Sequence, residues 1–280
     1  PYTRRAPARG SGHEGAISMA LLRNAVLVFV VLVLCGAGSA TGAEKPDGKA
    51  VAAMVHDRPD GNDRTQLCTM TLVNQRGATR TRTLEIRSKD YGKDQKSIMV
   101  FRAPADVKNT MFLSWSYDDP DRDDDRWLYM PAMKNVRRIS GSGKNEYFMG
   151  TDFTYDDLGK RSVGKDTHTL LGEETLNGMD CWKLESVPVD RDDMYTRRIS
   201  WVDKTSHIAV RTDYYDKDGL QKRLEVKELR QHNGIWTTFH SEMNNISRGH
   251  RTVLKIDAID YDTGLGDELF RVATLQRGRL

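Results

Sequence analysis

The chain has 280 residues, of which 38% are hydrophobic and 30% are charged, which is the composition of a globular protein rather than a disordered one. This length fits one large β domain or two small domains. The formal net charge of +3 arises within the first 43 residues, where four arginines face one glutamate, and the remainder of the chain is neutral. Because nucleic-acid-binding proteins usually carry a net basic surface, no nucleic acid is expected among the partners.

Residues 1–43 are predicted to contain a signal peptide. Met19–Arg23 supplies a short basic start, Ala25–Leu34 is an almost unbroken apolar run, and the small residues up to Ala43 offer two cleavage sites. Residues 1–18 are expected to precede the true start at Met19. The apolar run of about ten residues is shorter than the roughly 20 that a spanning helix needs, so an uncleaved anchor is the less favoured interpretation. Cys35 follows the large Leu34, which argues against lipid modification, and we expect a soluble product exported to the periplasm.

Residues 44–280 are predicted to form a single domain, because no linker rich in Pro, Gly or Ser divides them. The domain begins with a short helix over Ala50–Val55 that ends near Pro59–Gly61. The residues that follow have the alternation of antiparallel strands, with a helical interruption expected at Asp152–Leu158. The expected strands are Leu67–Val73, Thr79–Ser88, Ser97–Arg102, Met111–Tyr117, Arg126–Met130, Val136–Ser140, Thr167–Leu176, Cys181–Val187, Tyr195–Val202, His207–Tyr215, Lys222–Leu229, Ile235–Met243 and Thr252–Ile259.

Short turns join these expected strands in sequence order. Asn74–Gly77 and the dipeptide Asn177-Gly178 are hairpin signals, and Asp216–Gly219 is a further turn. Consecutive strands joined in this way favour a meander, and a sheet of this many strands must curl or close. The predicted fold class is therefore mainly β, with a single large antiparallel sheet.

The familiar catalytic motifs do not occur in the sequence. There is no Gly-rich phosphate loop before a helix, no G-x-S-x-G nucleophile elbow and no H-E-x-x-H zinc pair. The acidic run Asp118–Asp125 lacks the central Gly and the terminal Glu of an EF-hand calcium loop, so a solvated turn is the favoured interpretation. The seven histidines are scattered, which leaves zinc ligation by three distant ones as a minor alternative. We expect no enzyme activity, no metal and no cofactor.

Two cysteines, Cys68 and Cys181, remain after cleavage of the signal peptide. In an oxidising compartment such a pair can form one disulfide. Two separate buried thiols are the favoured alternative, and the sequence leaves the choice open.

Aromatic and apolar side chains are concentrated on strands of the middle third of the chain. Eleven methionines occur in the chain as a whole, and Met is frequent at adaptable apolar binding sites. For any one of these residues ordinary core packing is the simpler explanation. As a group they indicate a curled sheet whose interior must be filled by side chains or by a ligand.

Several sequence motifs together resemble the outer-membrane lipoprotein-sorting protein family, whose members are similar to the periplasmic carrier LolA. The similarity extends over about residues 50–278 and is closest to a standalone subgroup of the family. The motifs that carry it are Phe101–Val107, Thr110–Leu113, Arg126–Pro131, Tyr147–Leu158, Glu268–Phe270 and Leu275–Gly278.

The resemblance implies an unclosed half β-barrel with an apolar concave side and short capping helices. It implies a periplasmic carrier that holds a lipid or a lipoprotein acyl chain during transit between envelope membranes, without catalytic residues. An inner-membrane transporter of the resistance-nodulation-division type is the implied partner. Because the motifs are those of the standalone subgroup, the cargo need not be a lipoprotein. The residues expected to line the cavity are Phe101, Phe112, Trp115, Trp127, Tyr129, Phe153 and Trp201, with Trp127 and Tyr129 first and Phe153 on a capping segment.

Three other functions compete with the carrier. An envelope sensor or regulatory module would share the half-barrel, but it would need a second domain, for which the chain after Phe270 is expected to leave no room. A structural envelope protein would need the same apolar positions as a carrier. A lipid hydrolase would need a nucleophile and a base, and no such arrangement is recognisable.

Overall fold

The computed structural model describes residues 45–278. The expected signal peptide and Cys35 therefore lie outside the described residues. The expected helix over residues 50–55 is confirmed as α1, Gly48–His56, and the Asp47 side chain caps its start by accepting from the backbone N–H of Ala50 at 2.7 Å. No described helix is long and apolar enough to cross a membrane.

Thirteen strands follow α1 in the described chain and form one sheet. They are β1 (Asp63–Val73), β2 (Thr79–Tyr91), β3 (Asp94–Ala103), β4 (Met111–Ser116), β5 (Asp125–Met130), β6 (Asn135–Ile139), β7 (Asp166–Leu176), β8 (Met179–Pro188), β9 (Arg197–Asp203), β10 (Ala209–Asp216), β11 (Gly219–His232), β12 (Ile235–Asn245) and β13 (His250–Tyr261). Three short 3₁₀ helices precede β7 in the described chain: η1 (Gly141–Asn145), η2 (Phe148–Gly150) and η3 (Val163–Lys165). Two short helices follow β13: η4 (Asp267–Phe270) and α2 (Val272–Gln276).

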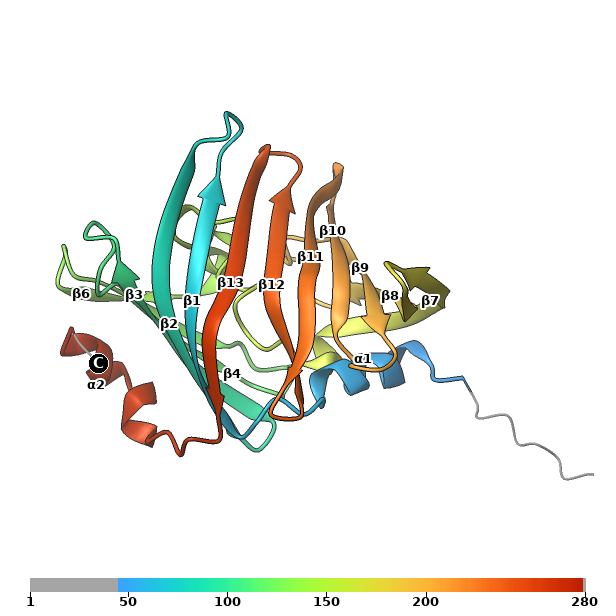
Figure 1. Ribbon diagram of the computed structural model, residues 1–280, viewed down its shortest axis with the longest axis horizontal. Coiled ribbons are helices and arrows are strands. Elements are labelled where there is room, and N and C mark those ends of the chain that lie inside the picture. The colour runs from blue at the N-terminus through green and yellow to red at the C-terminus, as the bar shows by residue number, and fades with distance from the viewer. Residues whose placement is uncertain (1–44, 279–280) are drawn as a thin grey trace, which may run out of the picture. The chain divides into compact units, whose positions relative to one another are not determined.

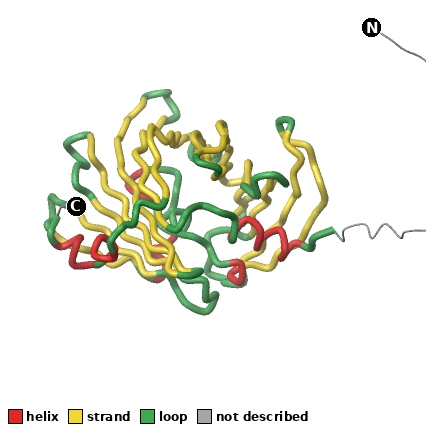
Figure 2. Tube along the Cα trace, turned by 60° about the horizontal axis from the view of Figure 1, so that its bottom comes forward, coloured by secondary structure: helices red, strands yellow, loops and turns green. Residues whose placement is uncertain are grey.

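The sheet consists of two antiparallel meanders that share its centre. β1 to β6 run outward in order to one edge, β7 to β13 run inward from the other edge, and β1 pairs with β13 in the middle. Figure 1 shows these two central strands side by side, in cyan and red. The edge strands β6 and β7 do not pair with each other, so the sheet stays open, and Figure 2 shows it curled around loop segments. The expected mainly β, single-sheet, unclosed architecture is confirmed.

The hairpin chemistry agrees with the expectation from sequence. Asn177 and Gly178 both have positive φ, 52° and 81°, and they join β7 to β8 where Leu176 lies opposite Met179. Both central residues of a type I′ turn need positive φ, which Asn and Gly tolerate best.

The prediction of a helix at Asp152–Leu158 is wrong. These residues form turns in which Thr154 donates its backbone N–H to the Asp157 carboxylate at 2.7 Å, while the Thr154 hydroxyl accepts from the Asp157 N–H at 3.2 Å. Short polar side chains of this kind offer the backbone an alternative to helical hydrogen bonds. They belong to a crossing segment, residues 140–165, that leads from the edge strand β6 to the opposite edge strand β7.

The crossing segment covers one face of the sheet, which we call the inner face. Arg82 of β2 donates to the carbonyl of Met149 at 2.8 Å, the Thr252 hydroxyl of β13 accepts from the Asp152 N–H at 2.9 Å, and Lys222 of β11 donates to the Asp152 carbonyl at 3.0 Å. The segment therefore passes over strands of both meanders. Helix α1 lies against β7 and β8, where Val51 and Ala52 pack with Leu184 and Val202.

The opposite, outer face is covered near β3 to β5 by the C-terminal helices. Phe270 and Leu275 are buried there against an apolar cluster, and the indole N–H of Trp115 donates to the Phe270 carbonyl at 2.9 Å. Asp63 in β1 holds the linker between β13 and η4, residues 262–266, in place. Its carboxylate accepts hydrogen bonds from the backbone N–H groups of residues 263, 264 and 265 at 2.9 to 3.0 Å.

Candidate functional site: a cavity beside the crossing segment

Apolar contacts hold the first part of the crossing segment on the inner face. The Phe148 side chain is fully buried, and its ring lies 5.8 Å from that of Phe101 and 5.3 Å from that of Phe112, measured between centroids. Tyr155 contacts the same group. The inner face over β1 to β5 is thereby filled by the protein's own side chains.

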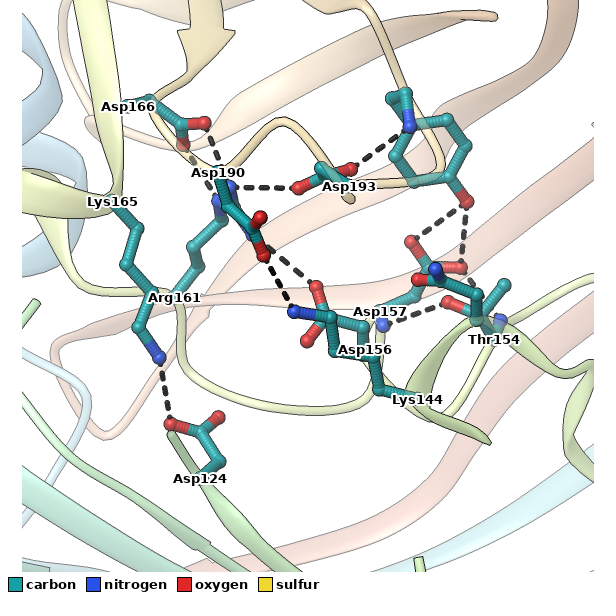
Figure 3. Close-up of polar contacts among 12 residues, drawn as sticks. Asp124, Lys144, Thr154, Asp156, Asp157, Arg161, Lys165, Asp166, Asp190 and Asp193 are labelled. Atoms are coloured by element: carbon teal, nitrogen blue, oxygen red, sulfur yellow. Dashed lines mark hydrogen bonds and ion pairs between the residues drawn. The ribbon is translucent and has the colours of Figure 1, made fainter. Parts of the chain in front are cut away.

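Charged contacts hold the second part of the segment. Arg161 pairs with three carboxylates, those of Asp166 at 2.6 Å, Asp193 at 2.9 Å and Asp156 at 3.2 Å. Figure 3 shows Arg161 among these groups. The pairing raises the pKa of Arg161 above its ordinary value although burial opposes that shift. Arg161 therefore stays charged and ties the segment to the start of β7 and to the loop before β9.

The flanks of this charged network carry two further ion pairs, Lys165 with Asp124 at 3.0 Å and Lys144 with Asp190 at 2.8 Å. Figure 3 shows both pairs beside Arg161. They connect the segment to the loop before β5 and to the loop after β8. An isolated exposed pair contributes little, but several pairs in one network hold a geometry more firmly.

A buried lysine attaches the segment to β11. Lys222 is fully buried, and its ammonium group lies 2.5 Å from the Asp157 carboxylate. Burial lowers the pKa of Lys222, and the Asp157 carboxylate opposes that shift. Three tyrosine rings lie 5.0 to 5.8 Å from the ammonium, those of Tyr147, Tyr195 and Tyr214. A buried charge is tolerated only with such partners.

A cavity of 460 Å³ lies beside the crossing segment, bounded by α1 and mainly by strands of the second meander, together with Arg64 of β1 and Gln95 of β3. This is within the range of roughly 300–1,000 Å³ that ligand pockets occupy. Its apolar wall consists of Ala52, Val55, Leu158, Val163, Leu184, Val202 and Ala209. Its polar wall includes Arg58, Arg64, Lys160, Arg161, His168, Ser186, Arg198, Ser200, Thr212 and Tyr214, together with four aspartates. Such a mixed lining suits a molecule that has both an apolar and a polar part.

Close packing fixes the helix that forms one side of the cavity. A Cβ atom on Gly48 would lie 2.7 Å from the backbone of His168 and Thr169, so only glycine lets α1 approach β7 this closely. The His168 ring in turn contacts the Ser186 hydroxyl and the Val163 carbonyl, each at 2.9 Å. Helix, strand and crossing segment are thus locked together around the cavity.

The structure places the residues predicted to line the cavity in three different surroundings. Phe101 and Phe112 lie on the inner face beneath Phe148. Phe153 is half-buried in the crossing segment. The other four are on the outer face: Trp115, Trp127 and Tyr129 in the cluster under the C-terminal helices, and Trp201 with Cys181 and Val210.

None of these seven residues lines the 460 Å³ cavity in the described part of the chain. Strand alternation groups Trp115, Trp127 and Tyr129 on one face, but it does not say which face is inside. Sequence reasoning missed the lining residues altogether: they come from α1, from Arg58, from the crossing segment, from β7 to β10, and from single positions on β1 and β3. The spacing of Val51, Ala52 and Val55 along a helix was the available signal, because it gives α1 one apolar side.

The two cysteines are free in the structure and belong to different clusters. Cys68 lies on the inner face and Cys181 on the outer face. Burial raises the pKa of the Cys68 thiol to about 12 and that of Cys181 to about 11. Neither thiol is therefore activated as a nucleophile.

Comparison with known proteins identifies the family. A family model with the description "Uncharacterized protein" matches residues 93–277. A crystal structure of a DUF1329 family protein from Desulfovibrio piger is 35% identical to the chain, with a TM-score of 0.78 over 81% of this chain and 97% of that one. The chain belongs to the DUF1329 family. No protein of curated function matches the sequence significantly.

Two further solved structures extend the comparison. A protein from Vibrio parahaemolyticus, described as a putative outer membrane lipoprotein-sorting protein domain, is 32% identical, with a TM-score of 0.78 over 82% of this chain and 98% of that one. A LolA superfamily protein from Nitrosomonas europaea is 18% identical, with a TM-score of 0.65 over 82% of this chain and all of that one, and it shows the shared fold. The expected resemblance to the lipoprotein-sorting family is confirmed.

Proposed function

We propose that this DUF1329 protein is a periplasmic carrier that binds a lipid or a lipoprotein acyl chain and moves it between envelope membranes. The observation that carries the proposal is the 460 Å³ cavity with one apolar wall, in a fold shared with a LolA superfamily protein. The description of the Vibrio relative as a lipoprotein-sorting domain supports the same role.

The energetics of such binding need no covalent chemistry. Each methylene group that leaves water contributes about 0.8 kcal/mol, so part of one acyl chain is enough for useful affinity. Release would require α1 to move away from β7, and such a movement would expose the apolar wall of the cavity. An inner-membrane transporter of the resistance-nodulation-division type is the partner that we propose for loading or release.

Native mass spectrometry of the protein purified from a bacterial periplasm, followed by lipid extraction, tests the proposal. We expect a bound species whose extracted mass corresponds to a lipid or another acylated molecule. A protein that carries no ligand and also fails to bind fluorescent fatty-acid probes would contradict the carrier function. Such a result would favour an envelope sensor or a structural protein.

A substitution that fills the cavity shows whether the ligand occupies it. Val55 lies on the cavity side of α1. Val55→Trp therefore places a large ring in the cavity. We expect Val55→Trp to abolish probe binding while the far-ultraviolet circular dichroism stays unchanged. Met133→Trp, at a position that is 67% exposed and is not part of the cavity lining, is the matched control. Equal probe binding by both tryptophan variants would show that the ligand does not occupy this cavity.

A further inference from the structure

The charges that line the cavity are not balanced. Each of its four carboxylates has a cationic partner within the described residues, whereas Arg58 and Lys160 form no ion pair there. The carboxylate pairs are Asp60 with Arg64, Asp156 with Arg126 and Arg161, Asp157 with Lys222, and Asp166 with Arg161 and Arg198. The cavity wall therefore carries an excess of positive charge.

Arg58 is the more informative of the two cations. One of its terminal N–H groups donates to the Val55 carbonyl at 3.2 Å, but its buried Nε has no hydrogen-bond partner among the described residues. Burial lowers the pKa of Arg58, with Asp60 opposing the shift. A guanidinium stays protonated even so, and a buried N–H group of a charged side chain without a partner is costly.

The position of Arg58 relates this charge to the apolar wall. It follows α1 directly and lines the same cavity as Val55, Leu184 and Val202. A guanidinium binds carboxylate and phosphate groups through two parallel hydrogen bonds, which neutral headgroups cannot match. The cavity thus combines an apolar surface with an unpaired donor that prefers an oxyanion.

We propose that the cavity selects an anionic amphiphile, whose carboxylate or phosphate group pairs with Arg58 while an apolar chain lies against Val55, Leu184 and Val202. This inference rests on the proposed carrier function and narrows its class of cargo. It explains why a charged side chain stands in the wall of a cavity for a hydrophobic ligand.

The test compares acidic and neutral ligands that share one chain. Delipidated full-length protein is titrated with palmitate, hexadecyl phosphate and hexadecanol, each displacing a fluorescent dansyl fatty acid. We expect both acids to bind more tightly than the alcohol. Arg58→Gln should weaken the acids by about 10- to 100-fold, the range for a lost hydrogen bond to a charged group, and leave the alcohol unchanged. Arg58→Lys keeps the positive charge but not the two parallel hydrogen bonds, so its affinity for the acids should lie between those of the original protein and Arg58→Gln.

The control variant is Arg80→Gln, which removes one positive charge from an exposed position on β2. It should not alter the affinity for any of the three ligands. The relative affinities of palmitate and hexadecyl phosphate show whether the acid is a carboxylate or a phosphate. Hexadecanol bound as tightly as both acids, or equal losses in Arg58→Gln and Arg80→Gln, would overturn the inference and leave the carrier function intact. Binding of none of the three ligands would contradict both.

Discussion

Phe148 shows how a single side chain determines where the inner face is free. It projects from the crossing segment and is fully buried against the strands that carry Phe101 and Phe112. An apolar ligand cannot enter this part of the curl without displacing it. The cavity lies mainly over the second meander, where the apolar wall consists of Ala, Val and Leu side chains instead of Phe rings.

Removal of the Phe148 ring should destabilise the protein strongly. We expect Phe148→Ala to lower the free energy of unfolding by about 3–5 kcal/mol, because it leaves a void among buried side chains. Urea denaturation followed by circular dichroism measures this change. Met133→Ala, at an exposed position, should change stability by less than about 0.5 kcal/mol. Equal effects of the two substitutions would contradict the role of Phe148 as the core of the crossing segment.

The cysteines provide a second measurement at the residue scale. Because burial raises the pKa of Cys68 to about 12 and of Cys181 to about 11, almost no thiolate forms at neutral pH. We expect neither thiol to react with Ellman's reagent in the folded protein and both to react in guanidinium chloride. Rapid labelling of either thiol under native conditions would contradict this burial, because the reagent could reach the sulfur only if the surrounding apolar side chains moved apart.

At the scale of elements, the sequence predicts where strands occur better than it predicts which side of each strand lies on the inner face of the sheet. Alternation in Thr81–Arg87 and the Asn177-Gly178 turn reflect local backbone preferences, so they were recognisable in advance. Trp127 and Tyr129 lie two residues apart and share one face of β5. That face is covered by Phe270 and Leu275, which are distant in sequence, and no local pattern could reveal this contact. The predicted role of these aromatic residues in ligand binding stays a prediction.

The crossing segment escaped prediction for a related reason. Its conformation depends on partners from many elements, including Arg82, Thr252 and Lys222, rather than on a periodic pattern of its own. The candidate site has the same origin, since its wall combines α1, this segment and strands far along the chain.

The docking of the C-terminal helices should depend on pH through Asp63. Burial alone would raise the pKa of this carboxyl, but the backbone and hydroxyl donors of residues 263–265 hold it below its ordinary value. A carboxyl with a lowered pKa stabilises the fold fully above the unfolded value, about pH 4, and that stabilisation is lost as the pH falls through the folded pKa.

We therefore expect Asp63→Asn to lower the Tm at pH 7 and to have a smaller effect at pH 3, where the carboxylate of the original protein is being protonated. Differential scanning calorimetry at both pH values measures the two differences. Asp121→Asn, in an exposed loop, serves as the control and should leave the Tm nearly unchanged at each pH. A Tm loss of the same size at both pH values would show that the charge of Asp63 does not hold the linker between β13 and η4.

At the scale of the whole molecule, the ion pair of Lys222 and Asp157 joins the crossing segment to the second meander. Removing one partner leaves the other as an uncompensated buried charge, which typically costs about 3–5 kcal/mol. We expect Lys222→Met to cause a loss of this size in chemical denaturation. The double variant Lys222→Met with Asp157→Leu should recover much of the loss, since neither charge then remains buried. A double variant as unstable as the sum of the single ones would contradict the pairing.

The meeting of β1 and β13 at the centre of the sheet has a consequence for how the chain folds. Arg64 lies opposite Tyr261, so this pairing joins strands from the two ends of the described chain. Contacts between such distant residues slow folding, because a long loop must close first. During synthesis β1 is made early and its pairing strand β13 comes last. In that interval β1 presents free backbone groups along a strand that carries Cys68, Met70 and Leu72 on one face, the kind of unpaired edge that promotes aggregation and that chaperones protect.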